Sequence, residues 1–153
     1  MSVSIVIRPA RAHERRALEE LQLRASTHWP TYREHLAAHP DAVEIPAAQI
    51  DNGLVRVAEQ AGEVAGFAVL LRPVAGACEL DGLFVEPSHM GAGVGRLLVA
   101  DAARIAGAQG AERIDVIANP DAVGFYERLG FTGDDDVATR FGPARRMRLA
   151  LTP

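Results

Sequence analysis

Apolar and polar residues alternate along several short segments of the chain, which is the pattern of strands with one buried face. In the first segment Val3, Ile5 and Ile7 fall on one face, and their β-branched side chains favour a strand. Two later segments are joined by Ala61-Gly62, which is typical of a hairpin turn. We predict strands over 2–8, 54–60, 63–72, 77–85, 113–118 and 147–151, and a strand fragment with a loop over 131–137.

Other segments repeat apolar residues every three to four positions, which indicates helices with one buried face. Leu18, Leu21 and Ala25 show this spacing in the first of them. Gly110 and Gly130 are placed to end the two later ones. We predict helices over 12–25, about 93–109 and 119–129, and, within the less regular segment 26–52, a short helix over 31–38 and a helical turn around Pro46.

The order of these elements predicts a mixed α/β sheet with helices on both faces. Meandering antiparallel strands come first, and a strand–loop–helix–strand crossover follows, which implies two parallel neighbours. At 153 residues the chain is long enough to bury a sizeable core. Since no internal repeat or linker divides it, we predict a single domain over 1–153.

The charge and the cysteine content exclude several classes of protein. A net charge of -4, without a basic stripe, argues against nucleic-acid binding and agrees with a cationic substrate. Cys78 is the only cysteine, so neither an intrachain disulfide nor a thiolate metal cluster is expected, and we predict no metal site. The sequence shows no signal peptide or membrane span, which favours a cytoplasmic protein without a membrane partner.

A strand-like apolar run is followed by Gly91, Gly93 and Gly95 and then by a helical segment. Alternating glycines and a helix N-terminus offer N–H groups to a phosphate or pyrophosphate, beside the positive charge of Arg96. A dinucleotide fingerprint does not fit, because its last glycine would fall on Arg96 or Leu98. A nucleoside-triphosphate loop does not fit either, because the chain contains no lysine.

Residues 83–98, Leu-Phe-Val-Glu-Pro-Ser-His-Met-Gly-Ala-Gly-Val-Gly-Arg-Leu-Leu, resemble the acyl-CoA signature of the GNAT N-acetyltransferase superfamily. Residues 119–131 resemble its second signature, Asn-x-x-Ala-x-x-Phe-Tyr-x-x-x-Gly-Phe, in the usual order. One departure is Met90, which stands where the family usually has glutamine or arginine. The resemblance implies a GNAT-like α+β fold, with a mostly antiparallel sheet of about six or seven strands and about four helices.

By this resemblance, the protein is expected to transfer an acetyl group from acetyl-CoA to a primary amine by direct attack in a ternary complex. The pyrophosphate would lie on the glycine-loop amides, and the pantetheine along the preceding strand, where a bulge would aim an amide near Leu83 at the thioester oxygen. Tyr126 would protonate the departing thiolate, and Asn119 would cap its helix and bond the pantetheine. The implied cofactor-binding residues are Leu83, Phe84, Val85, Met90, Gly91, Ala92, Gly93, Val94, Gly95, Arg96, Asn119 and Tyr126.

Glu79 and Asp81 are the candidates for the base that deprotonates the amine. They are two residues apart on one predicted strand, so we expect them to share a face with Leu83. Two neighbouring carboxylates raise the pKa of one of them, which suits a base near neutral pH. The alternatives are an electrostatic lining that attracts a cationic amine, and proton transfer through water or without a base.

The acceptor is not specified by these motifs. The candidates are a small-molecule amine and a protein N-terminal or side-chain amine. Trp29 and Tyr32 belong to the densest group of aromatic and histidine residues, which is interpreted either as a substrate wall or as a surface loop. The alternative function is a non-catalytic acyl-CoA-binding or regulatory domain. The sequence is also compatible with a homodimer.

Overall fold

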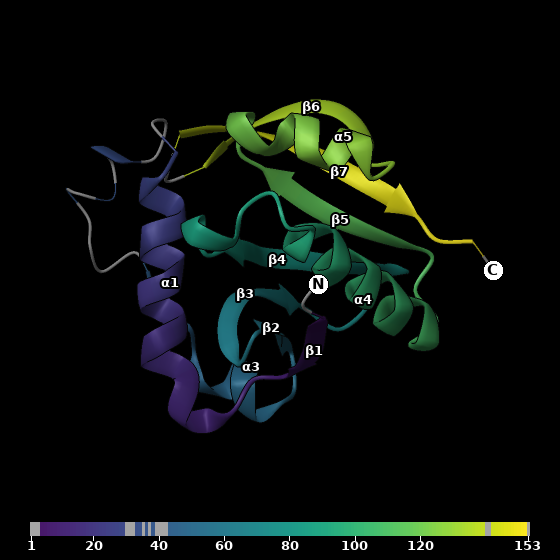
Figure 1. The fold of residues 1–153 in the computed structure, drawn as a ribbon. Coiled ribbons are helices and arrows are strands. Elements are labelled where there is room, and N and C mark those ends of the chain that lie inside the picture. Colours follow the sequence, from purple (N-terminus) through teal and green to yellow (C-terminus); the bar gives the residue numbers. More distant parts are fainter. Residues whose placement is uncertain are drawn as a thin grey trace.

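The computed structural model describes residues 4–29, 33–34, 36, 38, 43–139 and 142–152. Within them, seven strands form one sheet in the order β1-β2-β3-β4-β5-β7-β6 (Figure 1). All neighbouring strands are antiparallel except β4 and β5, which are parallel, so the predicted mixed and mostly antiparallel sheet is confirmed. The strands are β1 (Ile5–Pro9), β2 (Val55–Gln60), β3 (Glu63–Leu70), β4 (Ala77–Val85), β5 (Arg113–Ala118), β6 (Thr132–Thr139) and β7 (Gly142–Ala150).

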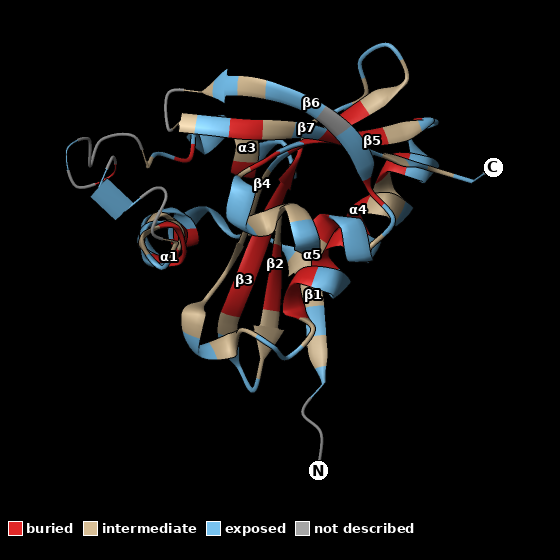
Figure 2. Ribbon diagram, turned by 90° about the horizontal axis from the view of Figure 1, so that it is seen from above, coloured by how far each residue is buried: buried red, intermediate tan, exposed pale blue. Residues whose placement is uncertain are grey.

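Helices cover both faces of the sheet, and the two faces have separate apolar cores (Figures 1 and 2). The helices α1 and α3 pack on one face, around the buried ring of Phe67. On the other face α4 and α5 pack around Leu98, Ile114 and Phe131. The helices are α1 (Arg15–Thr27), α3 (Ala47–Asp51), α4 (Val94–Ala108) and α5 (Val123–Arg128), with short 3-10 turns η1 (Ala12–Glu14), η3 (Pro87–His89) and η4 (Pro120–Ala122).

The predicted helices correspond to α1, α4 and η4–α5, since the spacing of their apolar residues is the spacing of their buried faces. The helical turn predicted around Pro46 is α3, whose N-cap is Pro46. Of the helix predicted over 31–38, residues 31, 32, 35 and 37 lie outside those that the structure describes.

The C-terminal hairpin is longer than the sequence predicts. β6 is a continuous strand, and β7 begins at Gly142 and not at 147. The acidic run in β6 indicates a loop when it is considered alone. In the sheet, Asp135 and Asp136 are opposite Arg146 and Arg145 of β7, and such opposite-charge pairs across antiparallel strands stabilise a sheet.

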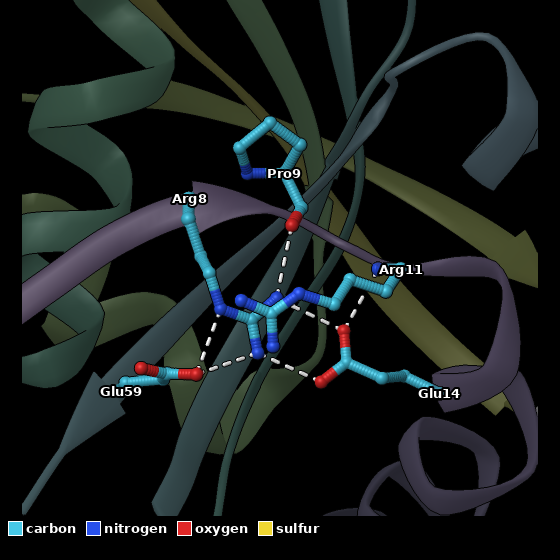
Figure 3. Close-up of polar contacts among 5 residues, drawn as sticks. All are labelled: Arg8, Pro9, Arg11, Glu14 and Glu59. Carbon is cyan, nitrogen blue, oxygen red and sulfur yellow. Dashed lines mark hydrogen bonds and ion pairs between the residues drawn. The ribbon is translucent and has the colours of Figure 1, made fainter. Parts of the chain in front are cut away.

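Arg8 joins β1, β2 and the turn that precedes α1 (Figure 3). Its guanidinium donates to the Glu14 carboxylate at 2.7 and 2.9 Å and to Glu59 at 2.8 Å. Glu14 also accepts from the backbone N–H of Arg11 at 2.8 Å. Because the carboxylate of Glu14 is bonded to Arg8, its pKa is lowered from 4.5 to about 2.

The parallel strands β4 and β5 separate part-way along their length. They pair from Ala77 with Arg113 to Leu80 with Val116, and β4 continues beyond this point to Val85 without β5 as a partner. The sheet is therefore split on the carboxyl side of Leu80. The split positions the candidate site.

Candidate active site

A large cavity of about 950 Å³ occupies the split between β4 and β5. Its walls come from α1, the exposed part of β4, the glycine loop, the end of β5 and α5. Of the predicted site residues that the structure describes, nearly all line it: Trp29, Glu79, Asp81, Leu83, Phe84, Val85, Met90, Gly91, Gly93, Val94, Gly95, Arg96, Asn119 and Tyr126. Ala92 is an exposed residue of the same loop, and Tyr32 lies outside the described residues.

The glycine loop has the backbone conformation of an anion site. Gly91 and Gly93 have φ values of 84° and 86°, in the left-handed region that other residues rarely adopt. Gly93 is the N-cap of α4, and its carbonyl accepts the N–H of Leu97 at 3.1 Å. The N–H groups of the first turn, from Val94 to Arg96, therefore have no acceptor within the helix. They form the positive end of its dipole.

Gly95 has a packing role in addition to the binding role that the sequence predicts. It is buried inside α4, and a Cβ atom built on it would lie 2.9 Å from the ring of Phe125. The third glycine of the loop therefore allows α5 to pack closely against α4. This contact brings the second sequence signature next to the first.

The backbone of β4 is available to a ligand along the split. Backbone polar groups of successive residues in a strand point to opposite sides. Glu86 donates its N–H to Ala65, on the β3 side, at 2.8 Å. By this alternation the N–H and C=O groups of Leu83 and Val85 point the other way, into the split. This supports the predicted site for an extended ligand along β4.

A bulge at Asp81 overturns the prediction that Glu79 and Asp81 share a face with Leu83. Leu80 and Gly82 pair with consecutive residues of β3, so Asp81 is the extra residue on β4. One extra residue shifts the alternation of side chains by one position. Leu83 therefore packs with Leu80 into the core under α4, and Glu79 lies on the opposite face.

Tyr126 is buried at the base of the cavity, where 6% of its surface is exposed. Its ring meets the rings of Phe125 and Phe131 edge-on, at centroid distances of 5.1 and 5.2 Å. Burial raises the pKa of the phenol above its usual value. The hydroxyl therefore keeps its proton over the physiological range and is a proton donor rather than a base.

Asn119 caps the turn that leads into α5, as its position in the sequence predicts. Its side-chain oxygen accepts the N–H of Ala122 at 3.0 Å, and Asn119 also lines the cavity. Met90 follows the turn η3, and the neighbouring His89 is held by Gln60, whose Oε1 lies 2.9 Å from the His89 Nδ1. His89 is thus oriented by the β2–β3 hairpin.

Sequence reasoning missed part of the cavity wall. Gln22 and Ser26 of α1 line the cavity, one position along from the apolar residues Leu21 and Ala25 that anchor the helix. Their i, i+4 spacing at the border of the apolar stripe is the signal that was available. Arg128, which is two residues after Tyr126 in α5 and at a variable position of the second signature, also lines the cavity.

The comparisons with known proteins agree with this geometry. The acetyltransferase (GNAT) family matches residues 16–131, which is most of the chain. The chain belongs to the GNAT acetyltransferase family. The match includes α1, the split strands and both signatures, so the GNAT family accounts for the elements that form the cavity. A comparison of the sequence with proteins of curated function found no significant match.

Solved GNAT structures share the fold over nearly their full length. The PaiA N-acetyltransferase from Thermoplasma acidophilum, in complex with coenzyme A, is 19% identical, with a TM-score of 0.79 and coverage of 96% of this chain and 99% of that one. A GCN5-related N-acetyltransferase from Rhodopseudomonas palustris is 23% identical, with a TM-score of 0.81 and 99% coverage of both chains. The protein yncA from Salmonella typhimurium, solved with acetyl-CoA, is 22% identical, with a TM-score of 0.72 and coverage of 98% and 95%.

Two further features of the described residues bear on the class of protein. No group of three or more histidine, cysteine, aspartate or glutamate side chains is placed there to hold a metal ion. Among the described helices, none is long and apolar enough to cross a membrane.

Proposed function

We propose that this GNAT protein transfers an acetyl group from acetyl-CoA to the primary amine of a small molecule or of a protein, by direct attack in a ternary complex. One observation carries the proposal: the glycine loop, the open edge of β4 and the Tyr126 phenol all line one cavity, at the split between β4 and β5. When bound, acetyl-CoA supplies an activated thioester. We propose that the reaction takes place in the cytoplasm.

The residues of the cavity fit this cosubstrate. The N–H groups of Val94, Gly95 and Arg96 suit a pyrophosphate, and the Arg96 guanidinium adds a positive charge beside them. The backbone groups of Leu83 and Val85 suit the amides of a pantetheine arm, which would bond to β4 much as another strand does. These groups would bind the pyrophosphate without a contribution from the side chain of Met90.

The reacting groups would meet where the split closes. The β4 backbone is irregular there because of the Asp81 bulge, and the amide of Leu83 points into the split, where it would donate to the oxygen of a bound thioester. Glu79 lies at the end of the paired segment and would accept the proton of the amine, directly or through water. Tyr126 would give its proton to the departing thiolate.

The test of this function is a Tyr126→Phe variant, assayed with acetyl-CoA and a panel of primary amines by release of free CoA. The phenylalanine ring keeps the packing on Phe125 and Phe131 but has no proton to donate. We expect kcat to fall about 100-fold, which is typical of a lost general acid. The Kd of CoA, measured by calorimetry, is the control and should change little.

An unchanged kcat in the Tyr126→Phe variant would remove the phenol from the mechanism. If the wild-type protein binds CoA tightly and acetylates none of the amines, the catalytic function itself is wrong, and a binding or regulatory role takes its place.

A further inference from the structure

A second pocket, of about 200 Å³, lies beside the closed end of the split. It shares Glu79, Val116 and Ile117 with the large cavity, so the two spaces adjoin where β4 and β5 stop pairing. None of its lining residues belongs to either sequence signature. Its lining residues are Leu71, Arg72, Val74, Ala77, Glu79, Asp115, Val116, Ile117 and Arg146.

The pocket opens on the face of the sheet that α1 covers elsewhere. Leu71 donates its N–H to the carbonyl of Glu79 at 2.9 Å, and its side chain packs with the core under α1. Ile117 and Arg146 are register partners on β5 and β7, so their side chains share a face. The small pocket therefore approaches Glu79 from the face of the sheet opposite to α4.

Charged side chains of both signs line this pocket, and most of them do not form ion pairs. Asp115 pairs with Arg113 at 3.0 Å. The side chains of Arg72, Glu79 and Arg146, in contrast, have no ion pair or hydrogen bond among the residues that the structure describes. Asp135 is opposite Arg146 across β6 and β7, but it forms no ion pair with it. A pocket with two unpaired guanidinium groups and one unpaired carboxylate complements a ligand that has an anionic group and an ammonium group.

Exposed apolar side chains border the same pocket. Val74 is 77% exposed and Ile117 is 39% exposed. Few other large apolar residues among those described are exposed to this extent. A ligand seated in the pocket would cover part of this surface and gain from its burial. The pocket thus combines charged groups that orient a ligand with an apolar wall that holds it.

We propose that this pocket is the acceptor subsite, and that the acceptor is a small zwitterionic amine, one that carries a carboxylate besides the amine that reacts. The inference rests on the proposed function. Glu79, at the junction with the large cavity, receives the amine, and Arg146 with Arg72 binds the carboxylate. Two strand spacings and a two-residue offset put the Cα atoms of Glu79 and Arg146 about 12 Å apart, which leaves room for a small ligand between the two side chains.

The test compares matched acceptors under saturating acetyl-CoA. Each set contains an amino acid, its amide and the amine without the carboxyl group: alanine, alaninamide and ethylamine, and 4-aminobutyrate, 4-aminobutyramide and propylamine. We expect kcat/KM for at least one carboxylate-bearing amine to exceed that of its amide about tenfold, as for a charged hydrogen bond. The variants R146Q and R72Q/R146Q should bring this ratio close to one. R148Q should keep it, since Arg148 is an exposed arginine of the same strand outside the pocket.

Equal kcat/KM for acids and amides in the wild-type protein would overturn the proposal, and so would a preference that survives in R72Q/R146Q. A longer peptide amine that reacts better than every small zwitterion would assign the pocket to a protein acceptor and also overturn it.

A binding measurement separates this proposal from the proposed function. The same amines and amides are titrated calorimetrically into the protein saturated with CoA. About tenfold tighter binding of a zwitterion than of its amide, lost in R72Q/R146Q, supports the subsite even when no amine is acetylated. Acetylation without any such difference in binding supports the transferase and rejects the subsite.

Discussion

At the scale of single residues, Glu79 has the most informative position in the site. It borders the large cavity and the small pocket, and it is the last residue but one of β4 that pairs with β5. Asp81, in contrast, is the exposed extra residue of the bulge. The sequence treats these two carboxylates as equivalent, and the structure separates them. We therefore propose Glu79, and not Asp81, as the residue that accepts the proton.

Replacing Glu79 with glutamine should remove the acidic limb of the profile of kcat/KM against pH, because an amide has no proton equilibrium in this range. We expect the plateau value to fall at least about 100-fold. The profile is measured by CoA release with one fixed amine acceptor.

The matched control for Glu79→Gln is Asp81→Asn, which removes the other carboxylate two residues away. This control should keep the acidic limb. If the limb persists in Glu79→Gln and disappears in Asp81→Asn, the base is Asp81.

At the scale of elements, the contact between α4 and α5 links the two sequence signatures. Gly95 of α4 lies against Phe125 of α5, and Phe125 in turn meets Tyr126 edge-on. The proposed phosphate site and Tyr126, the proposed proton donor, are therefore held together by one close approach between two helices. A side chain at Gly95 would disturb both.

The variant Gly95→Ala should destabilise the protein by about 1–3 kcal/mol, as expected for overpacking, because the new Cβ would lie 2.9 Å from the Phe125 ring. We also expect weaker CoA binding, since α5 must move away from α4. Chemical unfolding and CoA calorimetry are the measurements.

Gly107, in the last turn of the same helix, provides the control for Gly95→Ala. A Cβ built on Gly107 meets nothing within 4 Å, so Gly107→Ala should leave stability unchanged or raise it by up to about 1 kcal/mol. Equal effects of the two substitutions would show that the packing against Phe125 is not important.

At the scale of the whole molecule, the sheet separates two cores, and Arg8 connects its first strands to the start of α1 (Figure 3). The pKa of Glu14 in the folded protein is lowered from 4.5 to about 2 by this contact. A lowered pKa means that the contribution to stability is fully present above about pH 4.5 and is lost as the pH falls toward 2.

We expect Glu14→Gln to lower the free energy of unfolding at neutral pH by about 1–3 kcal/mol, because Arg8 loses one of its two charged partners in a largely buried position. The loss should shrink between pH 4.5 and pH 2, as the wild-type carboxylate becomes protonated. Urea unfolding at a series of pH values measures this.

Glu127→Gln, on the exposed surface of α5, is the control and should change little. A constant difference between the wild-type protein and Glu14→Gln over the whole pH range would contradict the role given to the Arg8 contact.

The sequence by itself determined most of the strands and helices and the glycine loop, because each depends on local properties, and its two signatures identified the GNAT family. Periodicity predicts a strand or a helix from neighbouring residues, and Gly91 and Gly93 adopt the left-handed conformations that glycine permits. The cap at Asn119 is equally local.

The tertiary structure alone decided the bulge at Asp81, the full length of β6 and β7, and the small pocket. Each depends on strand pairing between segments that lie far apart in the sequence. A shift of one residue in the register between β3 and β4 moves Leu83 to the face opposite Glu79. The same pairing places Arg146 of β7 two strands from Glu79, although the two are 67 residues apart in the chain. Local pattern carries no information about such distant neighbours.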